Sequence, residues 1–562
     1  MLLIASLLVL AFATNSCTLD NSNNTDIPAV PSSPLAPPAE EIAQAINSVA
    51  LGAGPGAIAH YEFSVVLDYI GHRAQVTQLV EIVNPGPDDW DRVVFHLPAD
   101  LQTNRFTLSR VSLLQQVEAA ARNIEISNDG FVTITLPDTV QPNEAVLVNI
   151  LFGLEAEQTL NVLRRPFGDV GFNERLLQFI NWYPRLVPYE PRRGWVRWEP
   201  TEVGPPLYAE IADFDLRIQA PEGVQIASGG PVSRVGNEWQ FAVQNARSIA
   251  FSASPEYVVL EQSVEGVTLL GFHLPEYGDE IQATLAAAGQ SLTLFNEKFG
   301  RYPYSTLVIA QNAYLPSVAA GGFVLHTGLG FDEYSGQPDA LLVVLVPLTM
   351  GEMWWGHFVG YNPIAEPWLG AALPMYSEYL FDEQYHDELT QWYWDNRIFY
   401  WEPEGPINRT AYDLETTEVL LRSVYRRGAL FLRDLRGQMG DEAFFAFLRE
   451  YYQNGAFRIV NSTDFFRTLS RYSTTDMSLI FDRYFDVEIQ LPTPAPTLTP
   501  IPSPGPPPTA TPPKTVHIVQ SGETLSEIAF RYGVTIDSIM FLNGIEDPER
   551  VFPGETLVIP DE

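Results

Sequence analysis

A proline-rich segment near the carboxyl end divides this chain of 562 residues into parts that fold separately. Between residues 492 and 513, eleven of 22 residues are proline, interspersed mainly with threonine, alanine and serine. Proline lacks a backbone N–H and fixes φ, so such a run forms neither a helix interior nor a sheet. We expect a stiff linker over 492–513, a large body before it and a small module over 514–562 after it.

The hydrophobic pattern of the body changes once along the chain. Over 55–258, short alternating segments such as HYEFSVVLDYI and DFDLRIQAP lie between turn signals, which is typical of antiparallel strands. Over 259–491, apolar residues recur at helical spacing, as in EIQATLAAAGQSLTLFNEK. The sequence therefore predicts a multidomain α+β protein with an N-terminal antiparallel β-sandwich or saddle, followed by a mainly α domain.

Charge and cysteine content exclude several functional classes. The chain has 32 Lys and Arg against 69 Asp and Glu, a formal charge of −37, which argues against a nucleic-acid partner because phosphate binding needs clustered cations. A single cysteine excludes an intrachain disulfide framework and any metal site built from several thiolates. Only eight histidines remain as imidazole ligands.

The amino terminus reads as an export signal. Residues 2–13, LLIASLLVLAFA, form an apolar run that is too short to span a bilayer but suits a signal peptide, predicted over 1–17. The only cysteine, Cys17, follows after Thr14-Asn15-Ser16, and the arrangement resembles a bacterial lipoprotein signal. The resemblance implies lipidation of Cys17, a polar tether over 18–54 and a membrane-anchored protein of the cell envelope facing outside the cytoplasm. An ordinary cleaved signal with an incidental cysteine is the alternative. The apolar run 341–348 is too short to be a further transmembrane helix.

The carboxy-terminal module has the pattern strand, helix, helix, strand. HIVQ and TLVIP read as strands, and Thr524 with Glu527 three residues later is the capping-box pattern of a helix start. The segments GETL, YGV, LN and PGETLVIP resemble the LysM family, which implies a βααβ fold that binds peptidoglycan or another GlcNAc-containing glycan. A LysM fold without glycan affinity is the alternative. The resemblance places the glycan-binding loops at Gly522, Glu523, Thr524, Leu525, Asn543, Gly544, Ile545, Glu546 and Asp547.

Residues from about 55 to 490 resemble another family. The segments FNEKFGRYPYSTLVIA, Gly321-Gly322, MWWGHFVG and EPWLGAALPMYSEYL occur in the order of the aminopeptidase-N family of gluzincin zinc metallopeptidases. The resemblance implies a thermolysin-like catalytic-type domain over 259–491. In that family two histidines at i and i+4 and a glutamate from the next helix bind zinc, and a glutamate beside the first histidine activates water.

The residues at those positions differ here. With Trp354-Trp355-Gly356 setting the register, the resemblance places the first histidine at Leu348, the base at Thr349, the second histidine at Glu352 and the third ligand at Ala371. The glutamate that binds a peptide's free amine falls at Val324. The oxyanion tyrosine remains as Tyr425, which we expect to be a packed helix residue. No bound metal and no cofactor are therefore expected.

A replacement metal site is not expected either. Glu352 and His357 are five residues apart, about 140° around an α-helix, so they should not share a face. His326 and His386 could meet only through the tertiary fold. We therefore expect a pseudoenzyme that uses its old cleft to bind a peptide or protein, or serves as a scaffold. The alternative is an active metallopeptidase with a non-standard zinc site, brought to the wall by its LysM module.

Overall fold

The computed structural model describes most of the body and much of the small module. The described residues are 56–98, 105–115, 117–120, 124–158, 170–199, 201, 203, 207–313, 317–473, 475–489, 491, 516–520, 523–532, 534–543, 545 and 556–559. The predicted signal peptide, the tether, the linker and Cys17 lie outside them. The chain separates into two compact units, residues 1–492 and 493–562.

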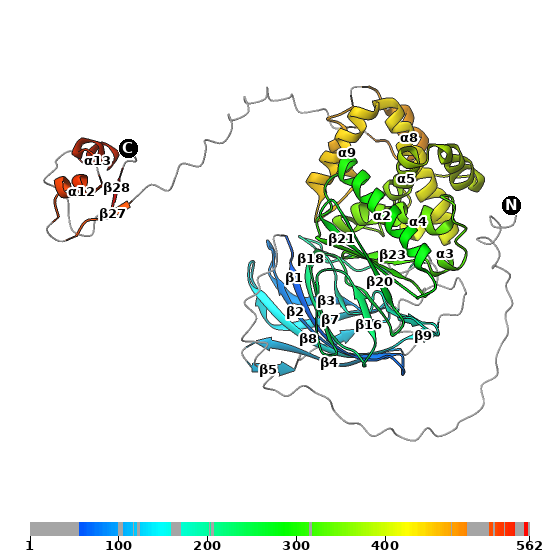
Figure 1. Cartoon of the computed structure of the whole chain (residues 1–562), viewed down its shortest axis with the longest axis horizontal. Helices are drawn as coiled ribbons and strands as arrows, with labels where there is room; N and C mark the ends of the chain where they lie inside the picture. The colour runs from blue at the N-terminus through cyan, green and yellow to red at the C-terminus, as the bar shows by residue number, and fades with distance from the viewer. Residues whose placement is uncertain are drawn as a thin grey trace, which may run out of the picture. The chain divides into compact units, whose positions relative to one another are not determined.

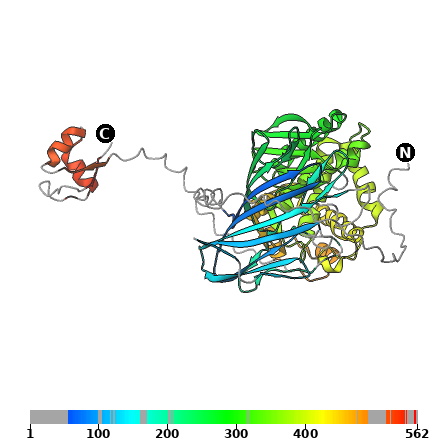
Figure 2. The same cartoon turned by 90° about the horizontal axis from the view of Figure 1, so that it is seen from below.

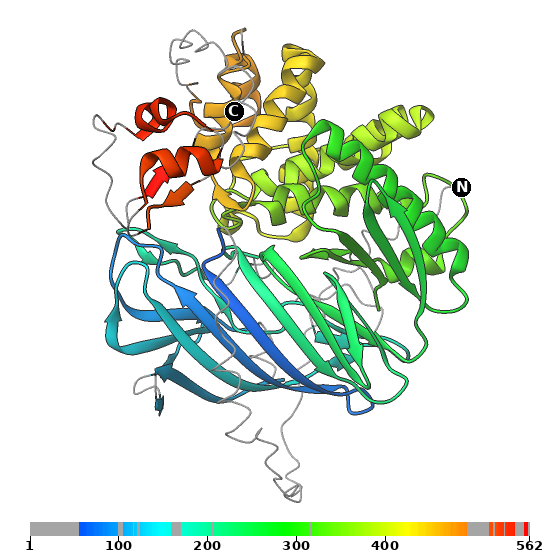
Figure 3. The same cartoon turned by 60° about the vertical axis from the view of Figure 1, so that its left-hand side comes forward.

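The first part of the larger unit is built on a long mixed sheet (Figure 3). Alternate residues of its strand β1, Tyr61, Phe63, Val65 and Leu67, are all buried, and this alternation determines which face of the sheet packs against the core. That strand pairs antiparallel with β2 and parallel with β15. In spatial order the sheet contains β17 (Val232–Val235), β18 (Glu238–Ala246), β15 (Ala212–Gln219), β1 (Ala59–Asp68), β2 (Arg73–Val83), β8 (Ala145–Glu155), β4 (Phe106–Gln115) and β5 (Val117–Ala120).

Two smaller sheets complete this β part. Their inner residues join the same hydrophobic core as the long sheet, and Trp182 and Tyr183 are buried between the layers against Phe63. One sheet contains β16 (Gln225–Ser228), β19 (Phe251–Ser254), β11 (Leu177–Phe179), β10 (Val170–Phe172) and β9 (Glu157–Gln158). The other contains β12 (Arg185–Leu186), β3 (Trp90–His96), β7 (Phe131–Val140) and β6 (Ile124–Ile126), and β13 (Tyr189–Glu190) pairs separately with β14 (Gly194–Trp195).

The second part joins a five-stranded sheet to a group of helices (Figures 1 and 2). The sheet contains β20 (Val258–Val264), β21 (Val267–His273), β22 (Thr306–Gln311), β24 (Phe323–His326) and β23 (Val318–Ala320), the last at its edge. A further strand pair is β25 (Val359–Tyr361) with β26 (Arg458–Val460). The principal helices are α2 (Gly278–Lys298), α3 (Gly328–Asp332), α4 (Leu341–Glu352), α5 (Trp368–Tyr385), α8 (Arg427–Met439), α9 (Asp441–Gly455), α10 (Ser462–Leu469) and α11 (Ser478–Tyr484).

Shorter helical segments connect these elements. They are η3 (Asp387–Leu389), α6 (Thr390–Trp392), η5 (Phe399–Trp401), η6 (Ala411–Asp413), α7 (Thr417–Leu420) and the π-helical turns η2 (Met353–Phe358), η4 (Tyr393–Ile398) and η7 (Leu421–Arg426).

Helix α4 and the π-turn η2 form one continuous apolar stretch. Leu341–Phe358 is long and apolar enough to cross a membrane by length and composition, and 72% of it is buried inside the folded unit. The helical stretch is thus longer than the apolar run 341–348 suggests. Its burial on nearly all sides fits a helix at the centre of a large domain.

Small residues let α4 and α5 approach closely. A Cβ on Gly351 would lie 3.0 Å from the Cα of Pro374, so only a glycine fits there without movement. A Cβ on Gly370, at the start of α5, would lie 2.0 Å from the ring of Tyr361. These two glycines bring the ends of both helices and the Tyr361 ring into one region of the molecule.

The smaller unit has the predicted βααβ order. It consists of β27 (Val516–Ile518), α12 (Leu525–Tyr532), α13 (Ile536–Asn543) and β28 (Thr556–Val558), and the two strands pair antiparallel. Its core contains Val519, Leu525, Ile528, Ala529, Ile539, Leu557 and Ile559. The predicted fold class, a β domain, a mainly α domain and a small βααβ module, is confirmed.

Candidate functional site

A cavity of about 240 Å³ lies between the β part and the helical part of the larger unit. The β part contributes Ile180, Asn181 and the segment 248–250. The helical part contributes the edge strand β23, the junction of α4 and η2, and the start of α5. The remaining lining residues are Leu207, Ser317, Tyr361 and Tyr425. The wall is therefore mixed, because apolar side chains and amide, hydroxyl, imidazole and carboxyl groups all line it.

Glu352 and His357 both line this cavity, which corrects the expectation that they occupy different faces. That expectation assumed an unbroken α-helix, but Met353–Phe358 forms a π-helical turn with i→i+5 geometry. Trp355 within it has φ −109° and ψ 27°, outside the helical range. The wider turn brings residues five apart to the same side.

Glu352 brings a carboxyl group to the cavity wall. Across the described part of the chain it accepts no hydrogen bond and pairs with no cation. Burial raises the pKa of Glu352 from 4.5 to about 7, because a charged carboxylate is costly where water is scarce. Burial, and then the charge of Glu352, raise the pKa of Tyr361.

His357 is held as a neutral ring. Burial, followed by the positive charge of Arg247, lowers the pKa of His357 to about 4, while a hydrogen bond to the backbone of Ala319 acts in the opposite direction. Its Nδ1 atom is buried and has no partner among the described residues. At neutral pH this side chain therefore adds a polar group to the wall but no positive charge.

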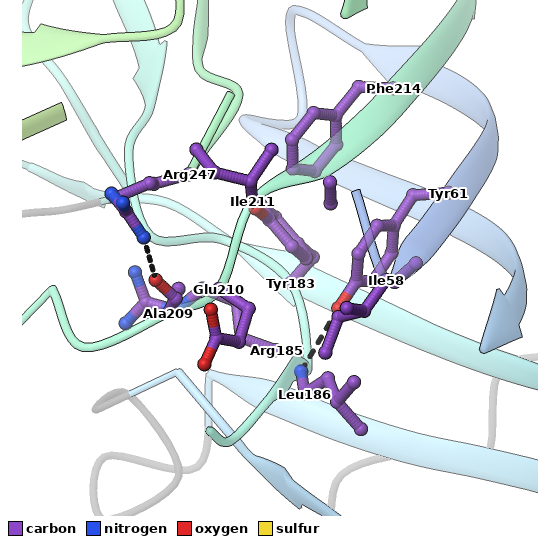
Figure 4. A pocket seen from close by; sticks show the side chains of 12 residues that line it. Ile58, Tyr61, Tyr183, Arg185, Leu186, Ala209, Glu210, Ile211, Phe214 and Arg247 are labelled. Carbon is purple, nitrogen blue, oxygen red and sulfur yellow. Dashed lines mark hydrogen bonds between the residues drawn. The ribbon is translucent and has the colours of Figure 1, made fainter. Parts of the chain in front are cut away.

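Arg247 connects the two walls of the cavity. Its guanidinium donates to the carbonyl oxygens of Ala209 at 2.7 Å, Arg458 at 2.8 Å and His357 at 2.9 Å. Figure 4 shows the bond to Ala209 at the edge of a second, much smaller cavity of about 10 Å³. Burial lowers the pKa of Arg247 to about 10, and the nearby Glu210 carboxyl partly offsets this. The cation belongs to the framework and does not line the 240 Å³ cavity.

The other residues that the peptidase resemblance singles out are placed differently. Leu348 packs against the main core, Ala371 is buried, and Thr349 donates its hydroxyl to the carbonyl of Leu345 at 2.8 Å. Val324 is buried in β24, and the neighbouring edge strand β23 lines the cavity in its place. The structure thus brings Glu352 and Tyr425 to the cavity, but not Leu348, Thr349, Ala371 or Val324.

These residues do not fit a zinc ion. Of the three ligand positions implied by the resemblance, only Glu352 carries a donor atom, because leucine and alanine side chains have none. Among the residues that the structure describes, no group of three or more His, Cys, Asp or Glu side chains is arranged to hold a metal ion. This donor set therefore supports no chemical step through a metal.

His326 and His386 have separate roles in the structure. The Nδ1 atom of His326 lies 3.0 Å from the hydroxyl of Ser317, and its Nε2 atom lies 2.7 Å from the carbonyl of Leu342. Both of its ring nitrogens are engaged, and burial lowers its pKa to about 4. His386 follows α5, with Nδ1 3.9 Å from a carboxylate oxygen of Glu388.

In the small module, several residues predicted to touch glycan hold the fold together. Asn543 donates to the carbonyls of Ile539 and Val558, both at 2.8 Å, and accepts from the Val558 N–H at 2.7 Å. Leu525 is a core residue. Thr524 and Glu527 form the predicted capping interaction, since the Thr524 N–H and hydroxyl donate to the Glu527 carboxylate.

Glu523, another residue of that predicted set, also has three partners within the module. It lies 2.9 Å from His517 Nε2, accepts from the Gln520 N–H at 2.9 Å and forms an ion pair with Arg531 at 2.6 Å. These contacts lower the pKa of Glu523 to about 2, the Gln520 N–H having the largest effect. Ile545 packs against the module's core, and the predicted residues Gly522, Gly544, Glu546 and Asp547 lie outside the described residues.

Sequence reasoning missed two features of these sites. Asn181 and Ile180, from the β part, line a cavity otherwise attributed to the helical part, and only their position beside the aromatic segment WYPRLVPYE gave a signal. Tyr361 was missed entirely. Its ring occupies the space beside Gly370 of the motif WLG, and a glycine in the sequence does not tell which side chain fills the space next to it.

Comparison with known proteins decides what the small module is. The LysM domain family matches residues 517–560. This segment is a LysM domain. LysM domains imply peptidoglycan binding and suggest association with the cell wall.

The larger unit resembles solved metallopeptidases in fold. An M1 zinc metallopeptidase from Deinococcus radiodurans matches with a TM-score of 0.56 and 16% identity, covering 80% of this chain and 98% of that one. A two-domain M1 zinc metallopeptidase mutant bound to L-arginine matches with a TM-score of 0.55 and 17% identity, covering 79% and 98%. At such identities the likeness shows the fold alone.

A curated protein is similar to part of the chain by sequence. Aminopeptidase N of Streptomyces lividans is 24% identical over 294 residues, which are 47% of this chain and 34% of that protein. The chain thus spans about a third of the length of that relative. The protein therefore combines a distant M1 aminopeptidase N-like fold with a C-terminal LysM domain.

Proposed function

We propose that this protein is an exported, lipid-anchored binding protein of the cell envelope. Its LysM domain attaches to peptidoglycan, Cys17 carries the membrane anchor, and the M1-like body is a zinc-less pseudoenzyme that holds a ligand in its cavity. Attachment at two ends raises the effective concentration of the body at the wall without either contact being tight.

The observation that carries the proposal is the composition of the cavity wall. A zinc peptidase needs three ligands and a base around one metal, and Glu352 alone among the corresponding residues carries a suitable side chain at the cavity. Tyr425 also lines the cavity, but a tyrosine without a metal and an activated water has no oxyanion to stabilise. Among the described residues, this lining offers groups that can bind a ligand but not the ligands and base that the family uses for peptide hydrolysis, which supports a binding role.

The first experiment measures zinc content and peptidase activity on the same sample. The full mature chain is exposed to zinc and desalted, and the bound metal is counted while hydrolysis of aminoacyl-amides is assayed. We expect well under one zinc per chain and no turnover. Stoichiometric zinc together with turnover would establish the alternative, an active metallopeptidase with a non-standard site, and would refute the pseudoenzyme. A variant with Leu348→His, Thr349→Glu, Glu352→His and Ala371→Glu is the comparison, because it restores the family's donor set.

Wall binding and anchoring are tested separately. The full chain should sediment with purified peptidoglycan, and a chain ending at residue 491 should not. If both forms sediment equally, the LysM domain is not the attachment. Labelling with a radioactive fatty acid in a bacterial host should mark the wild type and leave Cys17→Ala unlabelled, and equal labelling of the two would refute lipidation at Cys17.

A further inference from the structure

A serine and a histidine meet at the wall of the 240 Å³ cavity, in a geometry that the proposed function does not use. Strands β23 and β24 pair antiparallel with Val318 opposite Leu325, so the next residues along, Ser317 and His326, also lie opposite one another. The Ser317 hydroxyl oxygen lies 3.0 Å from His326 Nδ1. Ser317 lines the cavity, whereas His326 is buried and does not.

The direction of this hydrogen bond follows from the other side of the imidazole ring. His326 Nε2 lies 2.7 Å from the carbonyl oxygen of Leu342, which can only accept, so Nε2 carries a proton. Burial lowers the pKa of His326 to about 4, so the ring is neutral at pH 7 and Nδ1 keeps its lone pair. The Ser317 hydroxyl therefore donates to Nδ1. His326 is thus oriented as a base toward a hydroxyl of the cavity wall.

The backbone holds both side chains in place. The Asn312 N–H donates to the carbonyl of His326 at 2.8 Å, and the Thr327 N–H donates to Ser317 Oγ at 3.1 Å. An N–H that points at the hydroxyl oxygen stabilises negative charge as it develops there, while the imidazole takes the proton. A hydroxyl, a base within hydrogen-bond distance and a third group that orients the base together make an activated nucleophile.

The third group limits the chemistry of this pair. The carbonyl of Leu342 carries only a partial charge, so it stabilises an imidazolium less than a carboxylate would. The buried ring is also a weak base. Such a pair suits an ester with a good leaving group and not an amide, whose amine must be protonated before it leaves. A volume of about 240 Å³ admits a short acyl chain, and Glu352 on the same wall disfavours an acid group on that chain.

The β part adds an amide to the same wall. Arg185 donates to Oδ1 of Asn181 at 2.9 Å, so the NH2 group is the end of the Asn181 amide that can donate. Asn181 has φ 46°, a left-handed conformation that is uncommon outside glycine and recurs at functional sites. An amide N–H is a donor of the kind that stabilises the oxyanion formed when an ester is attacked.

We propose that Ser317 and His326 form a metal-independent acyl-transfer site that takes short, uncharged esters. Ser317 Oγ attacks the ester carbonyl carbon while its proton passes to His326 Nδ1, and the C–O bond to the alcohol then breaks as the alcohol takes that proton. The acyl group remains on Ser317 as an ester, and water attacks it by the same sequence and releases the acid. This inference goes beyond the proposed function and rests on it in one respect, that the cavity admits a ligand.

The test uses the full mature chain, p-nitrophenyl acetate at pH 7 and an excess of a zinc chelator. We expect p-nitrophenol to be released faster than in buffer alone. Mass spectrometry of the quenched protein should find an acetyl group on the peptide that contains Ser317, and p-nitroacetanilide, the corresponding amide, should not react. Release no faster than in buffer, or acetylation confined to other residues, would overturn the proposal.

The decisive variants change each partner separately. Ser317→Ala removes the nucleophile, and His326→Asn removes the base but keeps an oxygen that can accept the Ser317 hydrogen bond. Both should release p-nitrophenol at least tenfold more slowly, and an unchanged urea midpoint of His326→Asn separates the loss of the base from a loss of fold. The control Ser233→Ala removes an exposed hydroxyl of β17 and should stay within twofold of wild type. A wild-type rate in Ser317→Ala or in His326→Asn would refute the assignment.

The chelator separates this inference from the proposed function. If the protein retains no zinc and sediments with peptidoglycan but is not acetylated at Ser317, only the acyl-transfer site is wrong. If release of p-nitrophenol needs zinc and stops when the chelator is added, the zinc-less pseudoenzyme and this inference both fail.

Discussion

Replacing Arg247 with methionine should strongly destabilise the larger unit. The Arg247 guanidinium is buried and donates to three backbone carbonyls, which belong to Ala209, His357 and Arg458. Methionine keeps much of the volume but supplies no donor. All three carbonyl oxygens would then be left without this partner at a place that water reaches poorly.

The size of the effect follows from two opposing terms. Three hydrogen bonds from a charged donor contribute about 1.5–3 kcal/mol each. Against them stands the cost of burying the charge: a pKa for Arg247 lowered from 12.5 to about 10 corresponds to about 3 kcal/mol. Because methionine also leaves the carbonyls unpaired, we expect a net loss of about 3–5 kcal/mol in the free energy of unfolding.

The assay is equilibrium unfolding in urea followed by tryptophan fluorescence. With an m-value of about 4 kcal/mol/M for a unit of this size, the midpoint for Arg247→Met should fall by about 1 M. The control is Arg217→Met, because Arg217 is exposed on β15 and its nearest carboxylate, on Glu62, is 4.0 Å away. The control should stay within about 0.5 kcal/mol of wild type. A change below about 1 kcal/mol in Arg247→Met would refute the assignment of Arg247 as the link between the two walls.

Three further predictions concern other residues. Burial raises the pKa of the Glu352 carboxyl from 4.5 to about 7 on folding, so the unfolded carboxyl loses its proton first and stability falls as the pH rises through that window. In urea titrations, the free energy of unfolding of Glu352→Gln should therefore match that of wild type near pH 4 and exceed it by about 2–3 kcal/mol at pH 8. Parallel pH curves for the two proteins would contradict this. Gly370→Ala places a Cβ 2.0 Å from the Tyr361 ring, so it should lower the free energy of unfolding by about 1–3 kcal/mol, whereas Gly437→Ala, which meets open space, should not. Asn543→Ala removes three hydrogen bonds from a module with a small core, so it should lower the free energy of unfolding by about 2–4 kcal/mol and abolish sedimentation with peptidoglycan. Asn454→Ala, in the larger unit, is the control and should leave both unchanged. Full sedimentation of Asn543→Ala would count against this account.

The layers of the fold could be predicted because they depend on periodicity alone. Alternation in HYEFSVVLD places Tyr61, Phe63 and Val65 on one face, and that face is buried in the structure. The βααβ order of the LysM domain follows from a capping pattern and a few apolar positions, of which Leu525, Ile528 and Ile539 form the observed core.

The cavity could be predicted only in part, because its geometry departs from regular structure. A helical wheel assumes an α-helical period, whereas the π-turn at Met353–Phe358 widens one turn and brings His357 beside the cavity that Glu352 lines. The contributions of Ile180 and Asn181 arise where two parts of the chain meet. Such a contact depends on the tertiary fold and leaves no periodic signal.

The LysM residues show another limit of the sequence. Glu523 and Asn543 are among the residues at which the family resemblance places glycan contacts, yet their side chains are engaged by residues of the module itself. The pairing of Asn543 with Val558 spans fifteen positions and depends on how β28 closes the fold. A loop motif identifies the family, and the structure is needed to separate residues that hold the loop from residues that present it.

If the protein is held at the membrane and at the wall as proposed, the position of the cavity would give a bound ligand a mechanical effect. The described chain enters the larger unit through the β part at residue 56 and leaves it through the helical part at residue 491, so tension between the two ends passes across the seam that contains the cavity. A ligand in contact with both walls binds only while the seam is closed. At a concentration one hundred times its dissociation constant it would stabilise the closed seam by about 2.7 kcal/mol. Occupancy would then set the force that the seam withstands, and pulling would in turn release the ligand.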